Sequence, residues 1–249
     1  MKSVIKILLT IPLIIGLAVG LAFAKSITIK GSTTVLPIAQ PCAESYMNEN
    51  PDVDISVQGG GSGVGIASII DGTADIGNAS RAIKDKELDK AVSNGVTPKA
   101  HVIAMDGIAV VVNSLNPVNA LTKKELKDIF TGKVSMWRDG GKIVVVSRDT
   151  ASGTFEAFNS LALDKAKVRP DALMQASNKA VATTVANTPG AIGYVGLGYV
   201  TKEIKALTID GIMPEKETVL SGKYPLSRPL FMYTNGTPKG EVKEFIDFV

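Results

Sequence analysis

Apolar runs typical of strands alternate with helical patterns along most of this chain, and this alternation restricts its fold more than any other feature. A run at residues 26–30 precedes a helical pattern at 35–48, and a run at 54–58 precedes a second helical pattern at 64–70. Strands joined through helices lie parallel, because the helix carries the chain back to the start of the next strand. The sequence therefore predicts the α/β class, with a mainly parallel sheet covered by helices.

The alternation is interrupted once, where two apolar stretches follow one another without a helix between them. These stretches occupy residues 100–105 and 108–113. We expect the chain to cross there from a first lobe, residues 25–105, into a second lobe, residues 106–199.

The chain is then expected to return to the first lobe. Residues 196–199, Gly-Leu-Gly-Tyr, would form the return crossing, so that 200–249 completes the first lobe and 207–209 joins its sheet. The last helical pattern, 241–249, reaches the end of the sequence without a C-cap. We expect either a helix that frays or a sequence that is shortened at its C-terminus.

The N-terminal segment has the pattern of a secretory signal peptide. Lys2 and Lys6 give a positive start, residues 7–23 form an apolar core, and small residues precede an expected cleavage after Ala24. We therefore expect residues 1–24 to be a signal peptide and the mature protein to act in the periplasm. Because the apolar core is long, an uncleaved membrane anchor is the alternative.

Composition argues against nucleic acid as a partner and against most enzyme chemistry. Without Lys2 and Lys6, 25 basic residues (27 − 2) face 24 acidic ones, and no basic stripe remains to bind nucleic acid. The only histidine, His101, lies on a predicted strand, so a nucleophilic Ser62 or Ser152 would lack a general base. The sequence has no His, Cys and carboxylate cluster with metal-ligand spacing. We expect no enzyme activity, no metal and no cofactor, and a secreted serine hydrolase is the weaker alternative.

The turn at residues 147–154 has the chemistry of an anion cradle. It follows the apolar run 142–146 and precedes a helical pattern, so Arg148, Ser152 and Thr154 lie where a strand gives way to a helix. The first backbone N–H groups of a helix have no partners within it, and the helix dipole makes that end positive. Together with a guanidinium group, these donors suit a tetrahedral oxyanion.

Other strand-to-helix turns carry hydroxyl groups as well. Thr34 follows the first predicted strand, Ser62 lies in the glycine run 59–65, and Ser80-Arg81 follows a third, short strand. The glycine run is not a Walker loop, because no lysine stands after its last glycine. Since the carboxyl ends of parallel strands meet at one edge of a sheet, these turns predict a single shared oxyanion site.

Four segments of the chain, in order, resemble those of the phosphate-binding receptors of ABC-type phosphate importers. They are residues 31–37, 60–63, 75–81 and 148–154. The resemblance implies a two-lobed type II periplasmic-binding-protein (Venus-flytrap) fold, in which each lobe is a mixed, mainly parallel sheet flanked by helices. It also implies a monomeric receptor that captures inorganic phosphate between the lobes and delivers it to the permease subunits of an ABC transporter.

The same resemblance implies which groups hold the anion. Thr34 and Ser62 would donate from the first lobe, together with the backbone at Val35, while Arg148 and residues 152–154 would donate from the second. The full set of expected phosphate-binding residues is Thr33, Thr34, Val35, Ser62, Ser80, Arg81, Arg148, Ser152, Gly153 and Thr154.

Arg81 departs from the pattern of the family it resembles. Many members carry an acidic residue there, which accepts the proton that phosphate carries and sulfate lacks. An arginine cannot accept a hydrogen bond, so we expect Arg81 to add a charge-assisted bond to the anion. Asp149 would either orient Arg148 or serve as the acceptor. A receptor for sulfate, molybdate or tungstate is therefore the alternative to a phosphate receptor.

Overall fold

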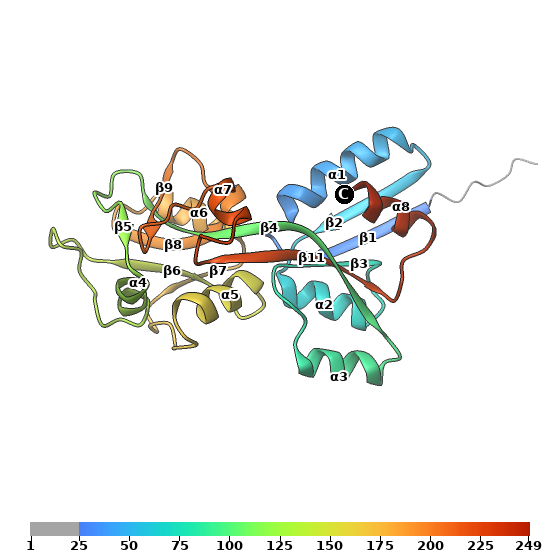
Figure 1. Cartoon of the computed structure of the whole chain (residues 1–249), viewed down its shortest axis with the longest axis horizontal. Helices are drawn as coiled ribbons and strands as arrows, with labels where there is room; N and C mark the ends of the chain where they lie inside the picture. The colour runs from blue at the N-terminus through green and yellow to red at the C-terminus, as the bar shows by residue number, and fades with distance from the viewer. Residues whose placement is uncertain (1–24) are drawn as a thin grey trace, which may run out of the picture.

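Two lobes, each with its own hydrophobic clusters, make up residues 25–249, the part of the chain that the computed structural model describes (Figure 1). The expected signal peptide, residues 1–24, lies outside the described residues. The first lobe contains β1 (Lys25–Gly31), α1 (Leu36–Glu49), β2 (Val53–Gln58), α2 (Ser62–Ile70), β3 (Ile76–Ala79), α3 (Asp85–Ser93) and, from the end of the chain, α8 (Gly240–Phe248).

Strand β1 is the centre of the first lobe and is parallel to both of its neighbours there, β2 and β3. Helix α1 packs Ala39 and Ala43 onto one face of these strands, and α2 packs Ile66 and Ile69 onto the other (Figure 1). β3 is buried along its whole length, whereas β1 and β2 alternate apolar with polar residues. Because β1 and β3 are parallel, both end at the same edge of the sheet, directly before the turns that carry Thr34 and Ser80.

Two long strands, β4 (Pro98–Asn113) and β11 (Ser227–Asn235), run between the lobes (Figure 1). They pair antiparallel with each other, and the second half of β4 pairs with the second lobe. The two stretches predicted at 100–105 and 108–113 are therefore one continuous strand, and the crossing lies inside it. Pro229 has no N–H to donate to a ladder, and the pairing of β11 is irregular next to it, between Leu230 and Phe231.

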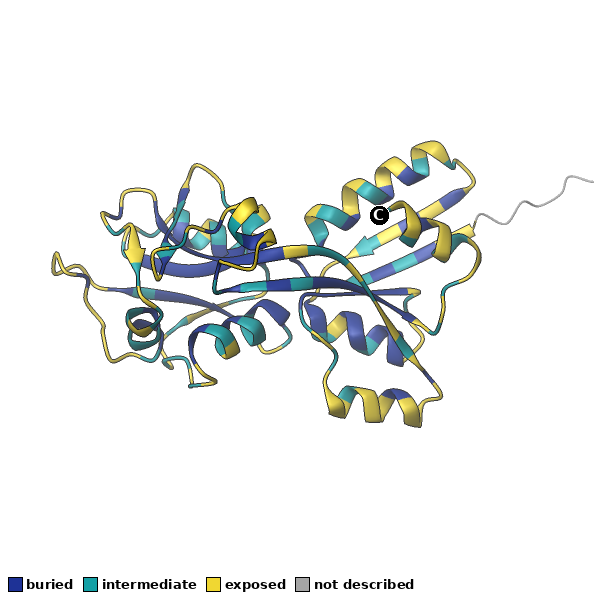
Figure 2. Cartoon of the chain, in the orientation of Figure 1, coloured by how far each residue is buried: buried dark blue, intermediate teal, exposed yellow. Residues whose placement is uncertain are grey.

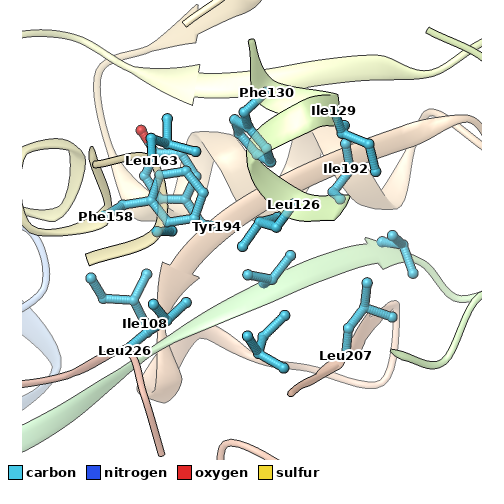
Figure 3. Close-up of a cluster of buried hydrophobic side chains, with 14 of the residues drawn as sticks. Ile108, Leu126, Ile129, Phe130, Phe158, Leu163, Ile192, Tyr194, Leu207 and Leu226 are labelled. Carbon is cyan, nitrogen blue, oxygen red and sulfur yellow. The ribbon is translucent and has the colours of Figure 1, made fainter. Parts of the chain in front are cut away.

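The second lobe packs around a cluster of aromatic side chains. The rings of Phe158 and Tyr194 stack with centroids 3.9 Å apart, and Phe130 lies 4.8 Å from Phe158 (Figure 3). The lobe contains β5 (Ala120–Leu121), α4 (Lys123–Phe130), β6 (Val144–Arg148), α5 (Gly153–Ala162), β7 (Leu173–Gln175), α6 (Asn178–Ala186), β8 (Ala191–Gly196), the 3-10 helix η1 (Leu197–Tyr199), β9 (Ile204–Ala206), β10 (Thr208–Ile209) and α7 (Lys216–Leu220).

The chain returns to the first lobe later than expected. Strand β9 pairs with β4 at the second-lobe end, and β10 pairs with β5 instead of joining the first lobe's sheet. Leu207 and Ile209 are buried in the second lobe's core together with Tyr224. The expected return at residue 200 does not agree with these contacts. We propose instead that residues 106–226 form the second lobe and that β11 carries the return.

Apart from β5 and β10, which form a two-stranded sheet of their own, the strands form one curled mixed sheet that spans both lobes. Its order is β2-β1-β3-β11-β4-β8-β6-β7, with β9 pairing β4 beside that path. Most of β11 and the second half of β4, residues 106–113, are buried, whereas the first half of β4 is half-buried or exposed (Figure 2). None of the helices within residues 25–249 has both the length and the apolar character needed to cross a membrane.

Candidate anion site between the lobes

The first turns of four helices meet where the lobes touch. Thr34, just before α1, lies 2.8 Å from Thr154 in the first turn of α5, measured between their hydroxyl oxygens. Gly63 in the first turn of α2 donates its N–H to the carbonyl of Ala151 at 3.0 Å. Asn178, the first residue of α6, also contacts Thr34. Four positive helix ends thus point at one small region, which favours a negative charge there.

Asn178 links the threonine hydroxyl groups of the first lobe to the second lobe. Its Nδ2 donates to the Oγ1 atoms of Thr33 and Thr34, both at 3.0 Å, and its Oδ1 accepts the N–H of Gly196 at 3.1 Å. Asn178 was not among the residues expected to bind the anion. A polar first residue in an alanine-rich helix carries no local sign that it reaches across a cleft.

Two buried serines of the first lobe, Ser62 and Ser80, pack against Gly153 of the second lobe. Ser62 Oγ accepts the N–H of Ser80 at 2.9 Å and lies 3.2 Å from Ser80 Oγ, and both side chains are fully buried. A Cβ atom at Gly153 would overlap Ser62 Oγ and would stand 2.8 Å from Ser80 Oγ. Only glycine at this position therefore lets α5 of the second lobe approach these serines.

The backbone of the cradle turn is arranged to donate. Ser152 caps α5, since its Oγ accepts the N–H of Phe155 at 3.1 Å. The N–H groups of Gly153 and Thr154 begin the helix and have no carbonyl four residues earlier within it. These two N–H groups and the Ser152 proton can reach an anion.

Val35 and Asp149 differ from the roles expected of them. The Val35 N–H, expected to bind the anion, donates to the carbonyl of Ser32 at 3.1 Å and so closes its own turn. Asp149 Oδ1 accepts the N–H of Ala151 at 2.9 Å. Asp149 thus fixes the shape of the cradle turn through its backbone, and no hydrogen bond between Asp149 and the Arg148 side chain is found among residues 25–249.

Arg148 is almost fully buried, with 1% of its surface exposed. Its Nε donates to the carbonyl of Gln175 and its Nη2 to that of Ala176, both at 3.0 Å, while Nη1 has no partner among the described residues. Burial lowers the pKa of this guanidinium group, because removal from water disfavours its charged form, and the charge of the neighbouring Asp149 opposes that shift. An oxyanion is the ligand that would satisfy the remaining donors.

A second buried arginine, Arg228, was not anticipated. It stands near the start of β11, and its Nε and Nη2 donate to Asp106 Oδ2 on β4 at 3.1 and 3.0 Å. Nη1 donates to the carbonyl of Ser80, and Nη2 also lies 3.2 Å from Thr34 Oγ1 and 3.0 Å from Thr154 Oγ1. Burial raises the pKa of Asp106, and the guanidinium opposes that shift. Asp106, a charged residue next to the apolar run 108–113, was a signal in the sequence, whereas Ser227 and Pro229 on either side of Arg228 hide the strand that carries it.

The side chain of Arg81 does not join the hydroxyl groups. Its Nη1 and Nη2 donate to the two carboxylate oxygens of Glu87 at 2.8 and 2.7 Å, and its Nε lies 2.8 Å from Glu156 Oε2. Glu156 also pairs with Lys84 at 2.6 Å. We expected Arg81 to bond the anion, but two carboxylates at the starts of α3 and α5 engage its guanidinium. Because Glu156 belongs to the second lobe, these ion pairs connect the lobes.

General bases and metal ligands are not assembled beside the serines. His101 lies on β4 in the first lobe and contacts Thr234 Oγ1 at 3.0 Å. Within residues 25–249, no group of three or more His, Cys, Asp or Glu side chains is placed to hold a metal ion. The described site therefore consists of hydrogen-bond donors around a buried guanidinium, an arrangement that can bind an anion.

Comparisons with known proteins show the family of this chain. A family model described as a PBP superfamily domain matches residues 21–249. The chain is 40% identical over 232 residues to the phosphate-binding protein PstS of Bacillus subtilis, across 90% of this chain and 75% of that protein. It is 34% identical to PstS of Staphylococcus saprophyticus, across 88% and 73% of the two chains. This chain belongs to the PstS family.

Solved structures confirm the expected type II periplasmic-binding-protein fold for this PstS-family chain. A putative phosphate ABC transporter substrate-binding protein with bound phosphate from Clostridium perfringens superposes with a TM-score of 0.82 at 34% identity, across 90% of this chain and 92% of that one. An ABC-type phosphate transport receptor from Vibrio cholerae gives a TM-score of 0.71 at 35% identity, across 89% and 92%.

Proposed function

We propose that this chain is an extracytoplasmic receptor that holds inorganic phosphate between its lobes and delivers it to an ABC transporter permease. The observation that carries this proposal is the contact between Thr34 of the first lobe and Thr154 of the second. The buried, partly unpaired guanidinium of Arg148, at the end of β6 before the turn that carries Thr154, supports it. The names of the PstS relatives and the phosphate bound to the Clostridium perfringens protein support phosphate as the anion.

The proposed phosphate contacts come from both lobes. Thr34, Ser62 and Ser80 contribute hydroxyl groups from the first lobe. Arg148 and the turn at residues 152–154 contribute guanidinium, hydroxyl and backbone donors from the second. Thr33 and Arg81 serve the site indirectly, because Thr33 bonds Asn178 and Arg81 bonds carboxylates. Val35 closes the turn that presents Thr34.

Closure of the lobes is the step that completes the site. Several bonds join the lobes without touching the proposed anion position: Gly63 N–H to the Ala151 carbonyl at 3.0 Å, and Glu156 to Arg81 and Lys84 at 2.8 and 2.6 Å. Only the closed form brings all donors together, so phosphate shifts the population toward it. The closed form is then the one that a permease would distinguish from the open receptor.

We infer that the chain is not an enzyme. A serine nucleophile needs a base within hydrogen-bond reach, and the described neighbours of Ser62 and Ser152 are hydroxyl and backbone groups. Hydrolysis of a phosphate ester by the purified protein, lost in Ser152→Ala, would support the alternative of a secreted hydrolase. We also propose that the receptor works as a monomer in the periplasm, which light scattering and cell fractionation would test.

Calorimetry on ligand-stripped protein tests the proposed anion. We expect one phosphate per chain to bind at both pH 6 and pH 8, and sulfate, molybdate and tungstate to compete poorly. Because the site is built almost entirely of donors, a receptor for another tetrahedral oxyanion is the second candidate. Tighter binding of sulfate than of phosphate at both pH values would replace the phosphate assignment with that candidate.

A further inference from the structure

The buried ion pair of Arg228 and Asp106 lies directly behind the hydroxyl groups of the proposed site. Both side chains are at least 94% buried, and they come from the two strands that cross between the lobes. Arg228 Nη2 contacts Thr34 Oγ1 of the first lobe and Thr154 Oγ1 of the second. The pair is thus the place where the crossing strands touch groups proposed to bind the anion.

Counting hydrogen-bond capacity at Thr34 shows what these contacts do. A hydroxyl oxygen has two lone pairs and one proton. At Thr34 Oγ1, Asn178 Nδ2 donates at 3.0 Å and Arg228 Nη2 at 3.2 Å. Neither of these groups can accept a proton there. Nη2 has two N–H bonds, of which one goes to Asp106 Oδ2 and the other is shared between the Oγ1 atoms of Thr34 and Thr154. Thr34 Oγ1 therefore faces only donors, one from Asn178 and one shared from Arg228. The Thr34 proton must then point to Thr154 or to the anion.

The same count applies to Thr154. Its Oγ1 accepts from Arg228 Nη2 at 3.0 Å and lies 2.8 Å from Thr34 Oγ1. When Thr34 donates to it, it also faces only donors, and its own proton must point away from both partners. When Thr34 instead donates to an anion, Thr154 keeps one lone pair and still has a proton to give.

We propose that Arg228, held by Asp106, is a positioning residue that fixes the Thr34 and Thr154 hydroxyl groups as donors to the anion. Asn178 has the same effect on Thr34 from the second lobe. Asp106 makes this possible, because its Oδ2 accepts from Nε and Nη2 and thereby holds the guanidinium in one orientation. A hydroxyl fixed as a donor loses no rotational freedom when it binds, which favours a ligand that only accepts at that point. The inference rests on the proposed function, since it assumes that both hydroxyl groups bind the anion.

A double-mutant cycle between Arg228 and Thr34 tests this role. Arg228→Met is made in an Asp106→Asn background, so that no unpaired carboxylate is left buried. We expect phosphate to bind roughly 10- to 100-fold more weakly in that protein than in Asp106→Asn alone, because the Thr34 and Thr154 hydroxyl groups would no longer be held as donors and their bonds to the charged anion would weaken. When Thr34→Val is also present, the Arg228→Met effect should shrink by at least about threefold, because the hydroxyl through which it acts is gone.

The controls separate positioning from folding and from direct charge. Arg169→Met with Asp171→Asn removes a second-lobe ion pair outside the cluster and should leave the phosphate Kd unchanged. Asn178→Ala combined with Thr34→Val gives a second double-mutant cycle that leaves the buried ion pair intact. If the Arg228 variant does not fold, this cycle tests whether donors held against Thr34 fix its hydroxyl group for the anion. If the fold-changes in phosphate Kd caused by Arg228→Met and by Thr34→Val multiply to within about twofold in the combined variant, the two residues act independently. That result would overturn the inference and assign Arg228 a direct contact with the anion.

The outcome stays distinct from a failure of the proposed function. If the wild-type protein binds phosphate and the cycle shows no coupling, only the positioning role is lost. If the wild-type protein binds sulfate in place of phosphate, the proposed function fails, and the same cycle measured with sulfate still decides the role of Arg228.

Discussion

Replacement of Arg148 by methionine should remove most of the anion affinity while leaving the lobes folded. Of the five N–H donors of a guanidinium, one on Nε and one on Nη2 are used by the carbonyls of Gln175 and Ala176, so three remain. Each hydrogen bond to a charged ligand contributes about 1.5–3 kcal/mol, and such contributions are not additive. We expect a loss of about 3–5 kcal/mol, or roughly 150- to 5,000-fold in the phosphate Kd.

The same replacement should have little effect on stability without phosphate. Arg148 is buried, its pKa is lowered by that burial, and only neutral carbonyl groups contact its guanidinium. Loss of the charge therefore offsets the loss of two hydrogen bonds, and the unfolding midpoint of the ligand-free protein should change by less than about 5 °C. The rise in midpoint that phosphate causes in the wild-type protein should disappear.

Titration calorimetry and thermal unfolding with and without phosphate measure both effects. Arg169→Met is the matched control, because that arginine pairs with Asp171 outside the cluster, and its phosphate Kd should be unchanged. If Arg148→Met kept its affinity within about threefold of the wild type, the anion would not be bound by this guanidinium, and the placement of the site would be refuted.

Three further substitutions test the ion pairs between the lobes, the close approach of the lobes at Gly153, and the pH dependence of stability. Glu156→Gln removes the carboxylate that pairs with the first lobe, so phosphate should bind about 2- to 10-fold more weakly and with less dependence on salt. An unchanged phosphate Kd would show that these ion pairs do not stabilise the closed form. Gly153→Ala should abolish tight phosphate binding with a normal unfolding midpoint, because its Cβ would overlap Ser62 Oγ in the closed form; wild-type affinity would show that the lobes need not approach so closely. The hydrogen bonds from Lys25 and from Tyr46 lower the pKa of Glu241, so this carboxylate stabilises the fold above its unfolded pKa and the benefit is lost as pH falls through its folded pKa. Glu241→Gln should therefore lower the unfolding midpoint more at pH 7 than at pH 3, and equal losses at both would exclude this linkage.

The sequence was most informative where the chemistry is local. The cradle at residues 148–154 combines a strand end, an N-cap serine and helical N–H groups within one turn, and the structure places Ser152 at that cap. Thr34 and Ser62 could be assigned for the same reason, since each stands directly before or at the start of a helix. Contacts of this kind depend on a few consecutive residues, which a pattern can capture.

Contacts between distant segments could not be predicted in the same way. Arg228 meets Asp106 because β11 and β4 pair across the lobes, and β11 itself contains a proline that obscures its strand pattern. Arg81 was expected at the anion because it stands where many relatives in the resembling family carry an acidic residue. Whether its long side chain turns toward a ligand or toward Glu156 depends on where the second lobe sits. The sequence predicts the place of a backbone atom better than the place of a guanidinium group, because an arginine side chain can adopt many rotamers.

The return of the chain to the first lobe was misplaced for a related reason. Strands β9 and β10 have only three and two residues, which is too short for a periodicity to show which sheet they join. Their partners are set by packing, since Leu207 and Ile209 fill the second lobe's core.

A crystal structure of the mature receptor grown with phosphate would test whether both lobes bind the same phosphate ion. The account predicts one phosphate between the lobes, with oxygen atoms about 2.7–3.0 Å from Arg148 Nη1 and from the Thr34 and Thr154 hydroxyl groups. Arg228 would remain bonded to Asp106 behind those hydroxyl groups. A phosphate bound elsewhere, or bound by one lobe alone with the other turned away, would contradict it.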